Sequence, residues 1–232
     1  MSLSIIHPCF NEQENIRSTV TKTLSWIDSA DIEAEIIVVD DGSTDNSPQI
    51  IKELIQGDSR VKGATHEKNA GYGIAVRTGC DAAANDHIAF VDSDGQFHIE
   101  DLQKLLPSLE DFSFVTGRRR RRADPFMRNL FGKILGLLIF VTFGMWVRDV
   151  NCGMKVFSAS TWKIVRPVYG TEKFFNTEIF LRLKKENIPY KQIDVGHYPR
   201  SAGSPTGASV HVIIGMFKEL WDLKKKLKSS NK

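Results

Sequence analysis

Short apolar runs alternate with longer segments of helical periodicity through the first 120 residues. Runs rich in β-branched or aromatic residues predict strands at 3–7, 35–39, 60–65, 87–91 and 112–116. Between them, apolar residues recur every three or four positions and predict helices at 11–30, around 50–55, at 74–84 and at 99–109. Ser43 and Thr44 are the expected caps of the second helix. Strands that alternate with helices indicate an α/β fold, in which a mostly parallel sheet is covered by helices on both faces.

The pattern changes after residue 122. Residues 134–147 carry no charge and lie between Lys133 and Arg148. As a helix they would be roughly 21 Å long, which is short of the ~30 Å hydrocarbon core of a bilayer. We therefore expect the apolar segment 130–148 to form a buried or interfacial helix, with the interfacial position favoured, rather than a membrane span.

The C-terminal residues 207–232 place apolar side chains at helical spacing among many lysines. This pattern is typical of a basic amphipathic helix. Two interpretations are equally compatible with it: the helix binds a membrane surface, or it packs on the domain and exposes its lysines to water. The expected organisation is one domain over residues 1–206, followed by this helix.

Composition supports a globular chain. The 232 residues are 41% hydrophobic and 25% charged, which argues against disorder and leaves ample chain for a core. The three cysteines, Cys9, Cys80 and Cys152, form no C-x-x-C motif. A disulfide framework or structural zinc site is therefore not expected, and a reducing compartment is favoured. The N-terminus lacks the basic and apolar stretches of a secretory signal.

The net charge of +3 conceals an asymmetry. Residues 1–110 hold 19 acidic and 8 basic residues, whereas residues 111–232 hold 9 acidic and 23 basic ones. An acidic half joined to a basic half suggests that one side binds a cation or a cation-bound ligand and the other an anionic partner. Charge alone leaves nucleic acid, a membrane surface and a lipid phosphate open as that partner.

Acidic residues follow three of the predicted strands. Glu12 follows the first strand, Asp40 and Asp41 the second, and Asp92 and Asp94 the fourth. In open α/β sheets ligands bind beyond the carboxyl ends of the strands, so these carboxylates should meet at one edge. Crowded carboxylates repel and raise one another's pKa, so the cluster needs a cation or donors from a ligand. Asp40 and Asp41 could each also cap the next helix.

The Asp92-x-Asp94 pair predicts a divalent cation site. Two carboxylates one residue apart can approach one ion as the chain turns, and Gln96 can add an amide oxygen. Such hard oxygen ligands suit Mg²⁺ or Mn²⁺ bound to a substrate diphosphate. The chain has neither the G-x-G-x-x-G fingerprint after its first strand nor a P-loop. Gly71 and Gly73 could let backbone N–H groups approach a ligand, or could simply form a tight turn.

Six motifs occur in an order and spacing that resemble the family 2 glycosyltransferases of the GT-A fold. They are PCFNE, VVDDGSTDNS, HEKNAGYGIAVRTG, FVDSDGQ, GRR and DVNCGMKVF, and the resemblance covers about residues 3–200. Within the family the chain is most similar to the dolichyl- and polyprenyl-phosphate sugar transferases, such as dolichol-phosphate mannosyltransferase. It departs from that pattern at Phe10, where the family usually has tyrosine, at Cys152, and after Arg200.

The resemblance implies roles for individual residues. A nucleotide-sugar pocket would be lined by Pro8, Phe10, Glu12, Asp40, Asp41, Lys68, Asn69, Gly73, Asp92 and Ser93. The metal would be held by Asp92, Asp94 and Gln96, and the catalytic set would be Asp92, Asp94, Asp149 and Arg118. The acceptor phosphate would meet Arg128, Arg200 and Ser204, and Glu178 matches a further acidic position. Arg119 to Arg122 are interpreted as a solvated basic loop without individual roles.

The activity implied is inverting transfer of a hexose from a nucleoside diphosphate sugar, of the GDP-mannose or UDP-glucose class, to a polyprenyl phosphate. A phosphate monoester has a second pKa of about 6 and is largely ionised, so no strong base is needed. Positioning, the metal and Arg118 would then stabilise the leaving diphosphate. Such an enzyme would work in the cytoplasm, attached peripherally to the membrane face.

Two alternatives remain open. The same fold could transfer sugar to a saccharide or protein hydroxyl, which needs a base such as Asp149. The chain could instead be a nonenzymatic nucleotide-sugar-binding protein. A membrane-protein partner or a homo-oligomer is left open, and nucleic acid is not expected because the arginine run lacks interleaved aromatic residues.

Overall fold

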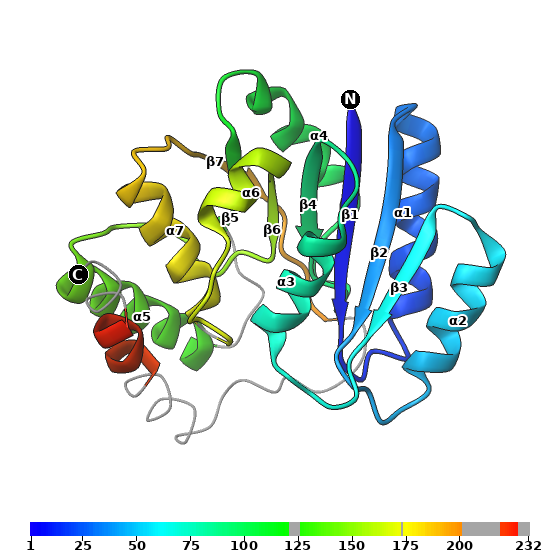
Figure 1. Ribbon diagram of the computed structural model, residues 1–232, viewed down its shortest axis with the longest axis horizontal. Coiled ribbons are helices and arrows are strands. Elements are labelled where there is room, and N and C mark those ends of the chain that lie inside the picture. The colour runs from blue at the N-terminus through cyan, green and yellow to red at the C-terminus, as the bar shows by residue number, and fades with distance from the viewer. Residues whose placement is uncertain (121–125, 173, 201–218, 227–232) are drawn as a thin grey trace.

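The computed structural model describes residues 1–120, 126–172, 174–200 and 219–226, without the side chains of 126–129 and 131. The described part of the chain forms a seven-stranded sheet in the order β3-β2-β1-β4-β6-β5-β7 (Figure 1). β1 to β4 are parallel, β6 is antiparallel to both of its neighbours, and β5 and β7 are parallel. The strands are β1 (Ser2–Cys9), β2 (Glu33–Asp40), β3 (Val61–Thr65), β4 (His87–Val91), β5 (Phe114–Arg119), β6 (Met154–Ser158) and β7 (Lys191–Val195).

Helices connect and cover these strands. They are α1 (Ile16–Ala30), α2 (Ser47–Gly57), α3 (Tyr72–Ala82), α4 (Leu102–Leu105), α5 (Phe126–Phe143), α6 (Ala159–Val165) and α7 (Phe175–Lys185), with 3-10 turns η1 (Ile99–Asp101) and η2 (Leu106–Glu110). Residues 219–226 are also helical. The mostly parallel α/β sheet predicted from the alternating pattern is therefore confirmed.

One local prediction is refined and one is wrong. The helix expected at 99–109 is present, but as the contiguous turns η1, α4 and η2; α4 gives way to η2 because Pro107 has no N–H for an α-helical hydrogen bond. Ser43 and Thr44 do not cap α2, which begins at Ser47 after Asn46. Instead, Ser43 Oγ accepts from Asn11 N–H over 2.9 Å. The loops after β1 and β2 are tied together in this way because the two strands are neighbours and end side by side.

The sheet buries one apolar cluster on each face. Alternate residues of β2 enter opposite clusters: Ile36 and Val38 one, Ile37 and Val39 the other. The face that contains Ile37 is covered by α3, α5, α6 and α7, and the opposite face by α1, α2 and α4.

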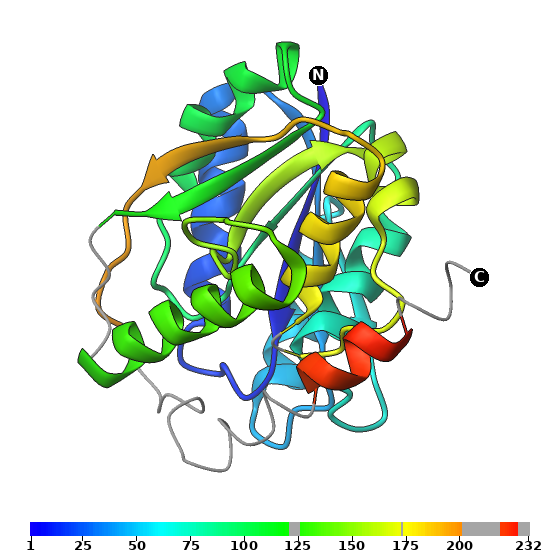
Figure 2. The same cartoon turned by 90° about the vertical axis from the view of Figure 1, so that its left-hand side faces the viewer.

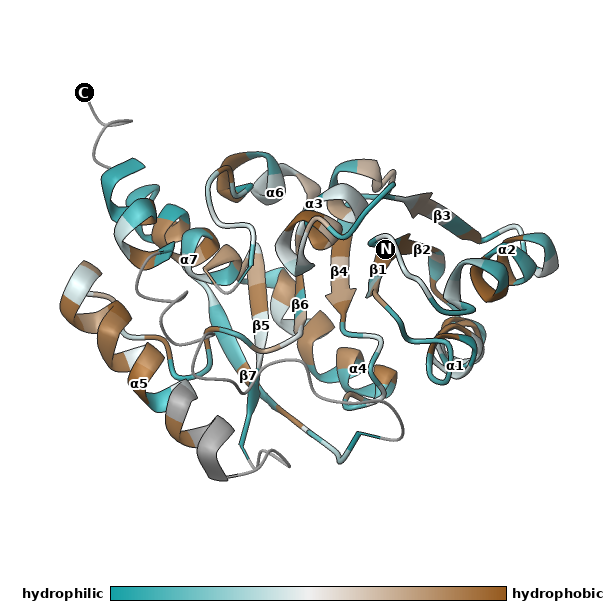
Figure 3. Cartoon of the chain, turned by 90° about the horizontal axis from the view of Figure 1, so that it is seen from below, coloured by the Kyte–Doolittle hydropathy of each residue, from teal (hydrophilic) through white to brown (hydrophobic). Residues whose placement is uncertain are grey.

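Helix α5 packs through one side and exposes the other. Leu135 and Ile139 join the buried cluster, whereas Leu137, Phe140 and Val141 are exposed, Val141 at 74%. Figure 2 shows α5 crossing the lower part of the molecule beside the helix at 219–226, and Figure 3 shows its apolar colouring. Within the described ranges, none of the helices combines the length and apolar character needed to cross a bilayer.

The helix at 219–226 packs on the domain. Leu220 and Leu223 are buried in the same apolar cluster as α7, while Trp221 is exposed. Of the two interpretations of the C-terminal segment, the described part corresponds to a helix packed on the domain.

His7 lies inside the fold where β1, β4 and α1 meet. Its Nδ1 donates to Val91 O over 2.9 Å, and its Nε2 lies 3.0 Å from Thr23 Oγ1. Burial lowers the pKa of His7 from 6.5 to about 4, and the bond to Val91 opposes this only in part. The folded protein therefore holds His7 neutral at pH values where the unfolded chain protonates it.

This difference predicts acid sensitivity. Between pH 6.5 and about pH 4 the unfolded state binds a proton that folded His7 does not, so the free energy of unfolding falls as the pH drops through this window. The full effect is about 3 kcal/mol. Urea unfolding at pH 7 and pH 4.5 should show a smaller loss of stability in His7→Gln than in the wild type. The exposed His98→Gln serves as control; an unchanged loss in His7→Gln would contradict the assignment.

Candidate functional site

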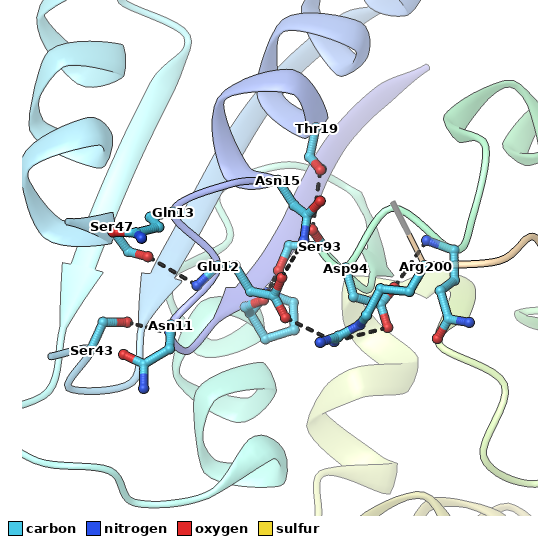
Figure 4. Close-up of polar contacts among 12 residues, drawn as sticks. Asn11, Glu12, Gln13, Asn15, Thr19, Ser43, Ser47, Ser93, Asp94 and Arg200 are labelled. Carbon is cyan, nitrogen blue, oxygen red and sulfur yellow. Dashed lines mark hydrogen bonds and ion pairs between the residues drawn. The ribbon is translucent and has the colours of Figure 1, made fainter. Parts of the chain in front are cut away.

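The loops that follow β1 and β4 meet at the edge of the sheet where these strands end. Arg200 Nη2 donates to Glu12 Oε1 over 2.9 Å and lies 3.4 Å from Asp94 Oδ2 (Figure 4). Because one guanidinium reaches both carboxylates, Glu12 and Asp94 face the same space. Acidic residues 82 positions apart in the sequence are thus neighbours, since β1 and β4 are adjacent strands.

Protein donors fix Glu12 in this position. Asn15 Nδ2 donates to Glu12 Oε2 over 2.7 Å, and Glu12 N–H donates to Ser47 Oγ over 3.0 Å. Burial raises the pKa of Glu12, and the bond from Asn15 and the charge of Arg200 offset this only in part. A cation close to Glu12 is therefore favourable.

Asp40 and Asp41 have different surroundings. Asp40 Oδ1 accepts from Ser43 N–H over 3.0 Å, while its Oδ2 is buried and has no hydrogen-bond partner within the described residues. Asp41 is fully engaged: it accepts from Ala70 N–H and Gly71 N–H over 2.9 Å each, and its Oδ1 lies 2.6 Å from His66 Nδ1. Asp41 thus fixes the loop before α3, whereas Asp40 keeps an acceptor for a ligand N–H or O–H group.

Lys68 and Asn69 lie on that same loop and are exposed. Their backbone packs on Gly42, where an added Cβ would come within 2.5 Å of Lys68 C and where φ is +71°. Only glycine suits this approach, so the loops after β2 and β3 are held against each other.

Asp92 and Asp94 form the centre of the predicted metal site. Tyr72 Oη donates to Asp92 Oδ1 over 2.8 Å, and Asp94 Oδ1 accepts from Gln96 N–H over 3.0 Å. Burial, followed by the charge of Asp94, raises the pKa of Asp92. The two carboxylates therefore lie close enough to repel each other.

This donor set fits a divalent cation bound together with a substrate. The described residues contain no group of three or more His, Cys, Asp or Glu side chains that could hold a metal. Mg²⁺ at phosphate sites commonly uses only one or two carboxylates and completes its shell with phosphate and water oxygens. Gln96 donates its side-chain N–H to Tyr198 O over 3.1 Å, which fixes the amide beside the two carboxylates.

The arginines that end β5 have unequal environments. Arg118, the expected phosphate ligand, pairs with Asp194 over 2.5 Å, and both side chains are partly exposed. Arg119 is only 7% exposed and donates through Nε and Nη2 to both oxygens of Asp149 over 2.8 and 2.7 Å. The solvated-loop interpretation is therefore wrong for Arg119, because β5 continues to this residue.

Residues 196–200 lie along the loop that carries Asp94 and Gln96. Tyr198 N–H donates to Gln96 O over 3.0 Å, and the Tyr198 ring stacks on His98 with centroids 3.8 Å apart. The pairing of Tyr198 with Gln96 and His98 places Arg200, two residues further on, beside Glu12 and Asp94. Its predicted contact with an acceptor phosphate stays a prediction, and the Arg128 side chain and Ser204 lie outside the described residues.

Pro8, Phe10, Ser93 and Gly73 are the remaining predicted residues. Pro8 O accepts from Ser93 Oγ, which links the ends of β1 and β4, and Phe10 is exposed beside them. Gly73 has a structural contact: its N–H donates to Thr171 O over 2.9 Å, and an added Cβ would come within 2.6 Å of Phe175. The N–H of Gly73 is therefore used within the protein.

Glu178 has contacts that are all within the fold, as far as the described residues show. Its fully buried carboxylate accepts from Val168, Tyr169 and Gly170 N–H over 2.7 to 2.8 Å. Three backbone donors and Arg182 satisfy the charge, so Glu178 fixes the turn that packs against the start of α3.

Sequence reasoning missed three residues near the site. They are Tyr72, Arg119 and Lys155, the last fully buried on β6 with its pKa lowered to about 8 by burial. A charged residue in the middle of an apolar strand, as in MKVFS, is the signal that could have identified Lys155. The partners of Tyr72 and Arg119 lie 20 and 30 residues away, and no local pattern shows them.

Arg200 occupies the position where a cation would neutralise Glu12 and Asp94, so it should compete with a divalent ion. We expect Arg200→Ala to be stabilised more by Mn²⁺ than the wild type, measured as the rise in melting temperature on adding the ion. Arg166→Ala, which removes a partly exposed pair with Asp81, is the matched control. An equal or smaller Mn²⁺ effect in Arg200→Ala would show that the arginine does not block the ion.

The chain is similar to known proteins in sequence. The model of the family described as glycosyl transferase family 2 matches residues 4–157. The chain is 28% identical over 219 residues to an undecaprenyl-phosphate 4-deoxy-4-formamido-L-arabinose transferase of Shewanella sediminis, covering 93% of this chain and 64% of the relative. It is 27% identical over 215 residues to a dolichyl-phosphate beta-glucosyltransferase of Dictyostelium discoideum, covering 83% and 65%. The chain thus spans just under two thirds of the length of these relatives.

The fold also matches solved structures. Glucosyl-3-phosphoglycerate synthase of Mycobacterium tuberculosis, crystallised with Mn²⁺, UDP-glucose and phosphoglyceric acid, superposes with a TM-score of 0.68 at 20% identity, over 95% of this chain and 80% of that one. This likeness supports the GT-A fold. The family match covers most of the sheet and the loops that carry Glu12, Asp40 and Asp94. The chain belongs to glycosyl transferase family 2.

Proposed function

We propose that this protein is an inverting, metal-dependent glycosyltransferase that moves a hexose from a nucleoside diphosphate sugar to a polyprenyl phosphate. The observation that carries the proposal is that Glu12 and Asp94 share the Arg200 guanidinium, while Asp40 and Asp92 lie at the ends of β2 and β4, the two neighbours of β1. Carboxylates there suit a nucleoside and a cation, and arginines suit phosphate. The two relatives named for sugar transfer to a lipid phosphate support this acceptor class.

The donor would lie over the ends of β1, β2 and β4. Asp40 Oδ2, buried without a partner in the described part of the chain, would accept from the base or ribose. Pro8, Phe10 and Ser93 would frame the same pocket, and the other residues proposed to line it are Glu12, Asp41, Lys68, Asn69, Gly73 and Asp92.

Asp92, Asp94 and Gln96 would hold Mg²⁺ or Mn²⁺. Bound there, the ion would neutralise charge that develops on the leaving diphosphate. The structurally similar synthase was crystallised with Mn²⁺ and UDP-glucose, which supports such a cofactor. Arg118 would add positive charge close to the same diphosphate, and Arg200 would face the phosphate of the acceptor.

The environment of Asp149 favours a phosphate acceptor over a hydroxyl acceptor. Transfer to a sugar or protein hydroxyl needs a base, and Asp149 is the candidate. Both of its oxygens accept hydrogen bonds from Arg119, which makes them poor proton acceptors. A phosphate monoester is already ionised at neutral pH and needs no base. Arg119 and Asp149 would then act as a fixed, neutral pair.

A direct assay tests the activity. Purified protein with Mn²⁺, polyprenyl phosphate and radiolabelled GDP-mannose or UDP-glucose should release labelled lipid into the organic phase with one of these donors. Asp94→Asn should lower the rate at least about 100-fold, because the charge that develops on the leaving diphosphate is no longer neutralised by a metal ion. Ser25→Ala, an exposed change on α1, is the control. Label found only in a water-soluble glycoside would favour the hydroxyl acceptor, and full activity in EDTA would exclude the metal role.

We also propose that the exposed side of α5 lies on a membrane surface. Leu137, Phe140 and Val141 form an apolar face, Trp146 packs edge-on against Phe140, and exposed Lys133 and Arg148 flank them. Apolar residues with a tryptophan and flanking cations are typical of an interfacial helix on anionic lipid. Lys184 Nζ donates to Gly144 O over 2.9 Å and fixes the end of α5 against α7. Attachment there would bring a lipid acceptor close to the site.

Flotation with vesicles of anionic phospholipid tests this surface. Val141→Glu should reduce the bound fraction severalfold, because a charge on this face must be transferred out of water. Ile55→Glu, on α2 far from α5, makes the same change at another exposed apolar residue and should float like the wild type (Figure 1). Equal flotation of both variants would contradict the membrane contact of this face of α5.

A further inference from the structure

Asp92 is held from two sides by residues outside its own motif. On one side, Tyr72 Oη donates to Asp92 Oδ1 over 2.8 Å. On the other side, Gly153 lies so close that an added Cβ would come within 1.8 Å of Asp92 Oδ2. Asp92 N–H also donates to Gly153 O over 3.0 Å. One oxygen of the carboxylate therefore accepts a hydrogen bond from Tyr72, and the other packs against the backbone of Gly153.

The position of Tyr72 is itself fixed by packing. Tyr72 is the first residue of α3 and stands between two glycines that touch the segment before α7. Gly71 has φ of +104° and leaves no room for a Cβ beside Glu172, and Gly73 N–H donates to Thr171 O. The Tyr72 ring meets Phe175 edge to face, with centroids 6.5 Å apart. The hydroxyl is thus held at a defined point by α3 and by the start of α7.

Gly153 is fixed in the same way by the sheet. It directly precedes β6, whose first residue, Met154, pairs with Val91 at the end of β4. The antiparallel pairing of β4 and β6 therefore sets the distance between Gly153 and Asp92. Any side chain at position 153 would have to displace the carboxylate, because the backbone on both strands is already paired.

We propose that Tyr72 and Gly153 are positioning residues that hold the Asp92 carboxylate in one orientation toward the space it shares with Asp94. This role rests on the metal-dependent transfer proposed above: Tyr72 and Gly153 would orient the Asp92 carboxylate before the ion binds. Hydrogen-bond donors to a ligating carboxylate fix its orientation, and their loss typically lowers metal affinity 10–100-fold. Without the Tyr72 hydroxyl, Asp92 gains rotational freedom that binding must remove.

Binding of Mn²⁺ alone, measured from the electron paramagnetic resonance signal of the free ion, tests this role. Tyr72→Phe removes only the hydroxyl and should weaken Mn²⁺ binding about tenfold. Tyr190→Phe is the matched control: this ring also packs at the edge of the apolar cluster, with its centroid 5.0 Å from that of Phe180. It should bind Mn²⁺ as the wild type does. Equal affinity in the two variants would overturn the proposal.

Gly153→Ala gives a second measurement. The added methyl should abolish Mn²⁺ binding because it occupies the place of Asp92 Oδ2, whereas Gly57→Ala, where nothing lies within 4 Å, should bind normally. Unchanged binding in Gly153→Ala would also contradict the proposal, and Tyr72→Phe decides alone if that variant does not fold.

Asp92→Asn distinguishes failure of the proposed metal site from failure of the positioning role alone. If wild-type Mn²⁺ binding survives this change, the metal role of Asp92 in the proposed function is wrong. If binding depends on Asp92 but not on the Tyr72 hydroxyl, the proposed function stands and only the positioning role fails.

Discussion

Negative charge gathered at one edge of a sheet must be balanced, and the arrangement of this edge follows from that requirement. Backbone N–H groups satisfy Asp41, Arg119 satisfies Asp149, and Arg200 reaches Glu12 and Asp94. Asp40 Oδ2 has no donor among the described residues, and burial and a neighbouring charge raise the pKa of Asp92. The charges of Asp40 and Asp92 are thus only partly compensated within the protein. These two carboxylates are available to a ligand, whereas Asp41 and Asp149 maintain the fold.

The asymmetry of charge along the chain has a physical explanation in this arrangement. The acidic half forms β1 to β4 and supplies Glu12, Asp40, Asp41, Asp92 and Asp94, whereas β5, β6 and the residues after β7 supply Arg119, Lys155 and Arg200. The insertion of β6 between β4 and β5 brings the two halves together. Lys155, buried between the rings of Phe90 and Phe180, adds positive charge beneath the same edge. The two halves thus form one electrostatic unit.

Local patterns predicted the parts of the fold that local physics determines. Apolar runs such as EIIVV identify buried parallel strands, and the acidic residues that follow them could be assigned to one edge because parallel strands end together. β6 and β7 were missed because MKVFS contains a buried lysine and KQIDV is a partly polar edge strand. The role of Arg119 could not be predicted, since it depends on how far β5 extends and on a partner 30 residues away. The contact of Arg200 with Glu12 spans 188 residues of sequence and follows only from the path after β7.

The position of β6 also affects how the chain must fold. β1, β2 and β3 can pair as soon as they are synthesised, but β4 gains its second neighbour only when β6 emerges, since His87 pairs with Ser158. Until then, the open edge of the HIAFV strand carries unpaired backbone groups beside an apolar surface, which is the state most prone to pair with another chain. Closing this distant pairing costs loop entropy and is expected to limit the folding rate. A nascent chain released before residue 154 would therefore expose the centre of its own sheet as a template for aggregation.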